Sequence, residues 1–233
     1  VVMELSKRLQ TIASCVTEGF RAADVGTDHG YIPIYLVQHK RCPHAFAMDI
    51  NEGPLQRAKQ HIAEMNLESR IDCILSDGLD GLPQKDVDSV ILAGMGGDLI
   101  VQILERGKEK LSCIRELILS PQSHPERVRL WLHQNGFRLL KEKMVLEDGK
   151  YYVICRAVHG TEFYEKECFY DFGRFLIMEQ DPILLEYLNL EYQKYEKITQ
   201  SLVDLSKERI QKRKTEVEQR LGAIKEALGY YEM

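Results

Sequence analysis

The sequence lacks a surplus of positive charge and a long apolar run. Its formal net charge is -5 at pH 7, whereas a freestanding nucleic-acid binder usually carries a basic surplus. Any contact with a polyanion must therefore come from a local basic patch. No run of about 18 apolar residues is present, so we expect no membrane span. The first residues, VVMELSKRL, lack the apolar core of a signal peptide.

Cysteine pairs with metal-binding spacing are also missing. The six cysteines are scattered along the chain, and none of them forms a C-x-x-C pair. No histidine spacing suits zinc either. We therefore expect free thiols in a reducing cytoplasm, a cytoplasmic protein and no bound metal.

Segments that favour strands alternate with helical segments before residue 137. The apolar strand-like segments lie at 20–25, 45–49, 71–75, 87–93 and 117–119. Such alternation predicts a parallel sheet with helices on both faces. Two further extended segments, 137–146 and 151–158, flank an Asp-Gly pair, which is a strong hairpin signal. The predicted fold class is α/β and Rossmann-like, with a seven-stranded, mostly parallel sheet closed by an antiparallel hairpin.

The pattern changes after this hairpin. Apolar residues follow heptad spacing in two stretches, 184–205 and 210–228, one residue out of register with each other. We predict two helices folded back as a coiled-coil-like appendage, with a turn near Ser206. One continuous helix is the alternative, because no glycine or proline marks the turn. The predicted domains are therefore 1–159 and 160–233.

The ends of the predicted parallel strands are acidic and rich in glycine. The first strand runs into the sequence DVGTDHG, in which Gly26 and Gly30 allow a ligand to approach the backbone closely. Ligands of open α/β sheets bind at such carboxyl ends. Asp24 and Asp28 would repel a pyrophosphate and attract a sulfonium and an ammonium. This charge favours S-adenosylmethionine over NAD, as does the absence of G-x-G-x-x-G; the alternative is a tight turn without a ligand.

Acidic residues also end the second and third predicted strands. Asp49 follows Gly26 by 23 residues, and a carboxylate there can accept hydrogen bonds from ribose hydroxyls. The alternative for Asp49 is a favourable interaction with a helix dipole. Asp77 could accept a hydrogen bond from an adenine amino group, with Gly78 or Leu79 beside the ring. The alternative for this segment is a simple Asp-Gly turn.

The fourth predicted strand ends in a loop of small residues, GMGG, that begins at Gly94. It lacks the polar-Pro-Pro-aromatic sequence that holds an exocyclic amine in many amino-directed methyltransferases. It leaves room for a flat base beside the methyl group, although a small loop also suits close helix packing. His29 is the single histidine near these strand ends, and we expect it to shape the site rather than act as a base.

Other residues near these strand ends could contact an RNA substrate. Gln122 could hydrogen-bond a base edge, and Tyr151 could stack on a base. Basic side chains on the flanking helices, Lys7, Arg8, Arg127 and Arg129, could hold phosphates, although a solvated helix face is the simpler explanation for each. The candidate RNA contacts are Lys7, Arg8, Gln122, Arg127 and Tyr151.

Six motifs carry a family resemblance: VGTDHGYIPIYL, AMDI, SDGL, ILAGMGG, LSPQ and DGKYY. With the helical tail, they resemble the bacterial tRNA (adenine(22)-N1)-methyltransferase family, TrmK, over essentially the whole chain. The resemblance implies a class I methyltransferase that uses S-adenosylmethionine, methylation of N1 of an adenosine in tRNA, and a tail that helps to grip the tRNA. It also implies catalytic roles for Asp28 and Met95 near the methyl group. The expected cofactor-binding residues are Asp24, Gly26, Asp28, His29, Gly30, Asp49, Ile50, Asp77, Gly78, Leu79, Gly94 and Met95.

The chemistry of this reaction makes modest demands on the enzyme. N1 of neutral adenine carries an available lone pair, so no strong general base is needed, and alignment of the reacting atoms dominates. We expect a monomer whose partner is tRNA. The alternatives are a methyltransferase for another substrate class and a non-catalytic RNA-binding module that kept the fold. A nicotinamide oxidoreductase is the least favoured.

Overall fold

The computed structural model describes residues 3–201 and 208–232. The chain divides into two compact units, Val1–Glu162 and Phe163–Met233. Among the described residues, no helix is both long and apolar enough to cross a membrane.

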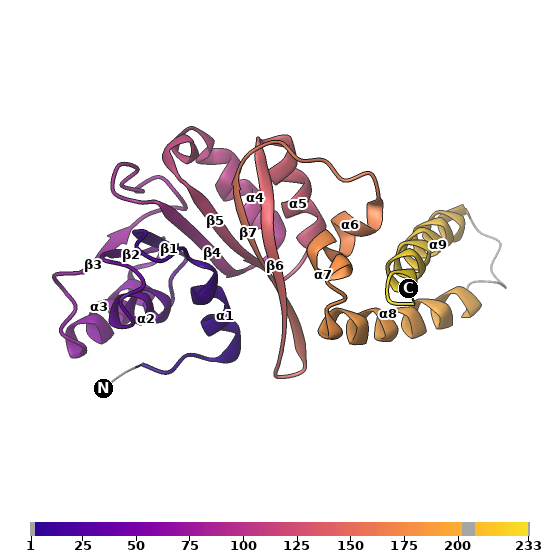
Figure 1. The fold of residues 1–233 in the computed structure, drawn as a ribbon, viewed down its shortest axis with the longest axis horizontal. Coiled ribbons are helices and arrows are strands. Elements are labelled where there is room, and N and C mark those ends of the chain that lie inside the picture. The colour runs from indigo at the N-terminus through magenta and orange to yellow at the C-terminus, as the bar shows by residue number, and fades with distance from the viewer. Residues whose placement is uncertain (1–2, 202–207, 233) are drawn as a thin grey trace. The chain divides into compact units, whose positions relative to one another are not determined.

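A seven-stranded sheet forms the centre of the first unit (Figure 1). Its strands are β1 (Ala22–Val25), β2 (Ala45–Asp49), β3 (Ile71–Leu75), β4 (Ser89–Met95), β5 (Glu116–Pro121), β6 (Phe137–Glu147) and β7 (Lys150–His159). They lie side by side in the order β3-β2-β1-β4-β5-β7-β6. The first five strands run parallel, and β7 is antiparallel to both of its neighbours. The predicted fold class is therefore confirmed.

Helices pack on both faces of this sheet. They are α1 (Lys7–Cys15), α2 (Tyr31–Gln38), α3 (Glu52–Glu64), α4 (Gly97–Arg106), the 3₁₀ helix η1 (Lys108–Cys113) and α5 (Pro125–Gln134). Helices α1, α2 and α3 share one buried core with alternate sheet residues, such as Ala45, Ala47 and Ile91. Helices α4 and α5 pack against each other and against strands of the same sheet, outside that core. Strands β1 and β2 are buried throughout, as strands covered on both faces must be.

The second unit is helical, with α6 (Glu167–Phe172), α7 (Arg174–Met178), α8 (Pro182–Ser201) and α9 (Glu208–Gly229). Asp181 caps α8, because its Oδ1 accepts hydrogen bonds from the backbone N–H groups of Ile183 and Leu184 at 2.9 and 3.0 Å. Helices α8 and α9 pack together, and Tyr231, after α9, donates its hydroxyl hydrogen to the Asp181 carbonyl at 3.0 Å. The folded-back helix pair is thus confirmed over one continuous helix. The predicted turn near Ser206 lies outside the described residues.

A fully buried ion pair joins α5 to β6. The Nε of Arg129 lies 2.7 Å from Oε1 of Glu142, and the two side chains are 1% and 0% exposed. Both charges have lost their water, so each depends on its partner. This pair fixes the helix that follows β5 to the closing hairpin of the sheet. The expectation that Arg129 could hold a phosphate is therefore wrong, because its guanidinium is buried against Glu142.

Removing one partner of this pair should destabilise the first unit strongly. In Arg129→Leu, Glu142 keeps its burial and loses its cation, so we expect the free energy of unfolding to fall by about 3 kcal/mol. Chemical denaturation measures this change. Arg127→Ala, which breaks the exposed pair between α5 and Asp98 of α4, should cost under about 1 kcal/mol. Equal losses in the two variants would contradict the assignment.

Candidate active site

A pocket opens at the carboxyl ends of β1 and β4, where the strand order reverses. The chain proceeds from β1 toward β3 on one side and from β4 toward β5 on the other, and such a switch point is where open α/β sheets bind ligands. The cavity volume is about 330 Å³, within the range of roughly 300–1,000 Å³ for small-molecule sites. Its lining residues are Arg8, Leu9, Asp24, Gly26, Thr27, Asp28, His29, Tyr31, Ile32, Ala93, Gly94 and Gln122.

The turn after β1 requires glycine at its first position. Gly26 has φ +81°, and a Cβ added there would lie 2.7 Å from the terminal methyl carbon of Met95. The same contact brings Met95 of β4 beside the predicted glycine turn. Gly94 has φ +79° and faces open space, with nothing within 4 Å of a Cβ built on it. A side chain at either position would obstruct the pocket or strain the backbone.

Two buried carboxylates lie at the ends of the neighbouring strands β1 and β2. Asp24 is 7% exposed and Asp49 is 8% exposed. Burial raises the pKa of Asp24 to about 6; the side chain of Thr27 opposes this effect, and the charge of Asp49 adds to it. Oδ1 of Asp49 accepts a hydrogen bond from the Asn51 backbone N–H at 2.7 Å. Within the described part of the chain, neither carboxylate has a cationic partner. Asp24 lines the pocket and offers a negative charge to a ligand cation, whereas Asp49 is not among the lining residues.

Asp28, the second acid of the turn, is exposed and already paired. Its Oδ1 accepts a hydrogen bond from Nη2 of Arg57 on α3 at 2.8 Å, and Oδ2 lies 3.3 Å from Nε2 of His29. The His29 ring stacks on Tyr31 at 4.9 Å and on His61 at 5.5 Å between ring centroids. The three rings form an aromatic stack, of which His29 and Tyr31 line the pocket.

Sequence reasoning missed three members of this arrangement, Arg57, Tyr31 and His61. Tyr31 directly follows the glycine turn, and this position was the one available signal for it. Arg57 and His61 lie on α3, and only the packing of α3 beside the turn brings them to Asp28 and His29. Solvated helix positions of this kind carry no sequence signal of their own.

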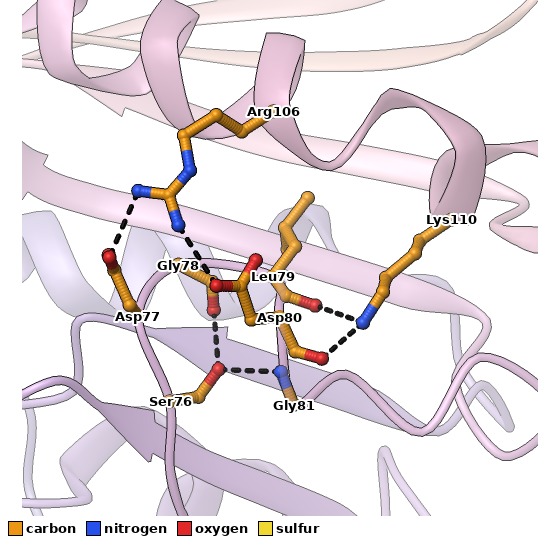
Figure 2. Close-up of polar contacts among 8 residues, drawn as sticks. All are labelled: Ser76, Asp77, Gly78, Leu79, Asp80, Gly81, Arg106 and Lys110. Carbon is orange, nitrogen blue, oxygen red and sulfur yellow. Dashed lines mark hydrogen bonds and ion pairs between the residues drawn. The ribbon is translucent and has the colours of Figure 1, made fainter.

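The other predicted acid, Asp77, belongs to the loop after β3. Figure 2 shows Arg106, at the end of α4, directed toward both Asp77 and Asp80. Leu79 as a whole residue is 1% exposed, its side chain packs at Gly107, and its carbonyl accepts a hydrogen bond from Nζ of Lys110 at 3.0 Å. Asp77, Gly78 and Leu79 are not among the residues that line the pocket.

The remaining predicted site residues are distributed around these features. Gly30, with φ +70°, precedes α2 and packs on Ala58. Ile50 follows Asp49 and is 58% exposed. Arg8 and Gln122, two of the expected RNA contacts, line the pocket; Lys7, Arg127 and Tyr151 do not. The remaining predicted residues in the lining are Asp24, Gly26, Asp28, His29 and Gly94.

Arg8 is held in place at the edge of the pocket by the closing hairpin. Its guanidinium lies 4.9 Å from the centroid of the Tyr152 ring, and its Nε is 3.9 Å from Oε2 of Glu147. Arg127 is paired with Asp98 at 2.7 Å. Among the described residues, no group of three or more His, Cys, Asp or Glu side chains is arranged to hold a metal ion.

The family model, the curated relatives and the solved structures that are similar to this chain point to one family. A family model described as tRNA (adenine(22)-N(1))-methyltransferase matches residues 22–226. The tRNA (adenine(22)-N(1))-methyltransferase of Bacillus subtilis (strain 168) is 34% identical over 98% of each chain. A Streptococcus pneumoniae protein, a putative tRNA (m1A22) methyltransferase solved with S-adenosyl-L-methionine, is 34% identical with a TM-score of 0.87 and covers 97% of this chain and 100% of its own. TrmK of M. capricolum, solved with S-adenosyl-homocysteine, is 28% identical with a TM-score of 0.86, covering 98% and 99%.

The buried Asp24 carboxylate should make the stability of the ligand-free protein depend on pH. Its pKa is raised in the folded state from an ordinary 3.8 to about 6, so the folded state holds the proton more tightly. The contribution of Asp24 to stability is therefore complete below about pH 4 and is lost as the pH rises through about 6.

Asp24→Asn removes this dependence. Relative to the wild type, the variant should gain roughly 3 kcal/mol of unfolding free energy between pH 4 and pH 7.5. Chemical denaturation at both pH values tests this difference, with Asp98→Asn, an exposed carboxylate, as the control. A difference between variant and wild type that is the same at both pH values would show that Asp24 is not desolvated.

Proposed function

The chain belongs to the tRNA (adenine(22)-N(1))-methyltransferase family, and we propose that the pocket between β1 and β4 is where it transfers the methyl group. The enzyme uses S-adenosylmethionine and methylates N1 of adenosine 22 in tRNA. Membership of this family favours this function over a methyltransferase of another substrate class and over a non-catalytic RNA-binding module. The single observation that supports the location is Asp24, a buried carboxylate that lines this pocket and has no cationic partner among the described residues.

The residues at this pocket suit the cofactor. S-adenosylmethionine supplies an electrophilic methyl group on a positively charged sulfur, and it also carries an ammonium group. Asp24 offers a desolvated negative charge, which attracts cations far more strongly than an exposed carboxylate does. Gly26, with its left-handed φ, leaves its backbone open to a close approach, and Gly94 faces open space. The donor set and the steric space therefore fit a small, cationic nucleoside.

We assign the nucleoside part of the cofactor to the next strand ends. Asp49 keeps Oδ1 on the Asn51 N–H and can use its other oxygen for the ribose hydroxyls. Ile50 is exposed beside it and offers an apolar surface to the adenine ring. Asp77 would accept a hydrogen bond from the adenine amino group, with the backbone of Gly78 and Leu79 at the ring. Gly30 and His29 complete the binding set through the shape of the turn.

The chain's own groups then need to orient the target adenine, and they need not remove a proton from it. The N1 lone pair would form a bond to the methyl carbon as the bond from that carbon to the cofactor sulfur breaks. The positive charge would thereby move from the sulfur onto the base, where a nearby carboxylate would stabilise it. Asp28 could be this carboxylate, since it lines the pocket and its side chain is exposed. Met95 contacts the glycine turn and would help to exclude water from the reacting atoms. The stacked rings of Tyr31 and His29 would pack against the target base and orient it beside the reacting atoms.

The RNA-binding residues follow from the same placement. Because the N1 edge of an adenine in folded RNA is paired or stacked, the base must be exposed before it reacts. Arg8 and Gln122 line the pocket and would contact the target nucleotide. Lys7 and Arg127 would hold phosphates farther out, Tyr151 would stack on a neighbouring base, and the α8–α9 pair would add a second grip on tRNA.

Three further features belong to this proposal. We infer a monomer in the cytoplasm, where the substrate is tRNA and the six free cysteines would stay reduced. We also infer that 1–159 and 160–233 are separate domains. Along the chain, the boundary between the two compact units lies three residues after this predicted boundary, between Glu162 and Phe163.

Replacing Asp49 tests the cofactor site. In Asp49→Ala, the ribose loses its charged acceptor, so the affinity for S-adenosylmethionine should fall at least about a hundredfold. Isothermal calorimetry measures the affinity. Nucleoside mass spectrometry of unmodified tRNA, incubated with enzyme and labelled cofactor, measures 1-methyladenosine, and the same assay on tRNA with another base at position 22 locates it. The wild type should form it and the variant should not at low cofactor concentration.

The matched control is Asp86→Ala. Asp86 is exposed and pairs with Arg21 at 3.0 Å, before the amino ends of β1 and β4, whereas the pocket lies at the carboxyl ends of these strands. This variant should keep both cofactor affinity and methylation. Unchanged cofactor affinity in Asp49→Ala would refute the ribose role, and methylation of free metabolites without tRNA methylation would refute the proposed substrate.

A further inference from the structure

The loop after β3 is seated on α4 and η1 by its backbone and its small residues. Gly78, with φ +57°, lies so close to α4 that a Cβ on it would be 3.1 Å from Cγ2 of Ile103. Leu79 packs against Gly107 so tightly that a Cβ there would be 2.5 Å from Cδ1 of Leu79. These contacts leave no room for the loop to move toward α4, and they involve no charged group.

Polar contacts hold the same loop backbone independently (Figure 2). The Ser76 hydroxyl donates to the Gly78 carbonyl at 3.0 Å and accepts from the Gly81 N–H at 2.8 Å. Nζ of Lys110, on η1, donates to the carbonyls of Leu79, at 3.0 Å, and of Asp80. The course of the loop backbone is thus fixed without any contribution from Arg106.

Arg106 adds a contact of a different kind, because it fixes side chains. Its Nη1 lies 3.0 Å from Oδ2 of Asp77, and its Nη2 lies 2.9 Å from Oδ2 of Asp80. All three side chains are about half exposed, with values of 53%, 49% and 61%. Exposed pairs of this kind contribute little to stability. What the guanidinium does determine is the rotamer of Asp77, since it occupies one carboxylate oxygen and leaves the other free to accept.

We propose that Arg106 is a positioning residue that sets the enzyme's preference for adenine in the cofactor. This inference rests on the proposed function, in which Asp77 accepts a hydrogen bond from the adenine amino group. With Oδ2 held by Arg106, Oδ1 of Asp77 is presented as an acceptor in a fixed direction. An amino group satisfies that acceptor, whereas the carbonyl of hypoxanthine would meet it with like partial charge. Without Arg106, Asp77 could rotate into solvent and the preference would weaken.

Calorimetry with two cofactor products measures this preference. S-adenosylhomocysteine and S-inosylhomocysteine differ in the amino or carbonyl group at C6 of the base and in the proton that hypoxanthine carries on the adjacent N1. The wild type should prefer the adenine compound by more than about tenfold. Arg106→Met keeps the aliphatic stem and removes the guanidinium, so the ratio of the two affinities should fall to within about threefold of unity. Arg106→Lys keeps one contact and should restore part of the ratio.

Two control variants separate this role from a structural one. Asp80→Ala removes half of the Arg106 contacts and leaves the Asp77–Arg106 pair, so its affinity ratio should match that of the wild type. Asp77→Asn offers an amide that can donate to a carbonyl, so it should shift the preference toward the hypoxanthine compound.

Each outcome decides between the proposals. If the wild type prefers adenine and Arg106→Met keeps the same ratio, the role of Arg106 is refuted, while the proposed function stands. The same conclusion follows if Arg106→Met weakens both compounds equally, or if Asp80→Ala loses the preference to the same extent. If the wild type binds neither compound, or binds both equally and Asp77→Asn changes nothing, the placement of adenine at Asp77 fails and the role of Arg106 fails with it.

Discussion

Two desolvated carboxylates at the ends of adjacent strands set the constraint on which this site depends. Asp24 and Asp49 are both less than a tenth exposed, and burial has already raised the pKa of Asp24 to about 6. Ionising a buried group without a partner is unfavourable. A cation bound beside Asp24 would therefore lower the free energy of its ionised form. Gly26 of the glycine turn and Gly94, which faces open space, line the same pocket as Asp24, and Met95 contacts Gly26.

The acids at the strand ends thus fall into two groups with different uses. Asp24 and Asp49 are buried and lack a cationic partner among the residues that the structure describes. Asp28 and Asp77 are exposed, and each is held by an arginine at 2.8 or 3.0 Å. A buried charge supplies binding energy to a cation, whereas an exposed charge held by arginine supplies direction. In the proposed site, Asp24 lies near the cationic part of the cofactor and Asp49 near its ribose, whereas Asp28 faces the target base and Asp77 the adenine of the cofactor.

Much of this could be predicted from the sequence, because the signals were local. Buried parallel strands are continuous apolar runs, and the Asp-Gly pair marks the hairpin, so the fold class followed directly. The acids and glycines at strand ends were readable for the same reason. The arginine partners were not: Arg57 and Arg106 each lie 29 residues after the carboxylate they hold, and only the packing of a later helix creates the pair. The aromatic stack of His29, Tyr31 and His61 likewise could not be predicted, because the tertiary fold brings these rings together. No local pattern separates an arginine that orients a carboxylate from one on a solvated helix face.

The central claim is that the buried carboxylate of Asp24 binds the cationic part of the cofactor. The number of protons released on cofactor binding tests this claim most directly. Calorimetry at pH 6 in buffers with different heats of ionisation measures this number. Because Asp24 is partly protonated in the free protein at that pH, binding of S-adenosylmethionine should release a substantial fraction of a proton, and Asp24→Asn should release none of it. A wild-type binding enthalpy that does not depend on the buffer would contradict the claim.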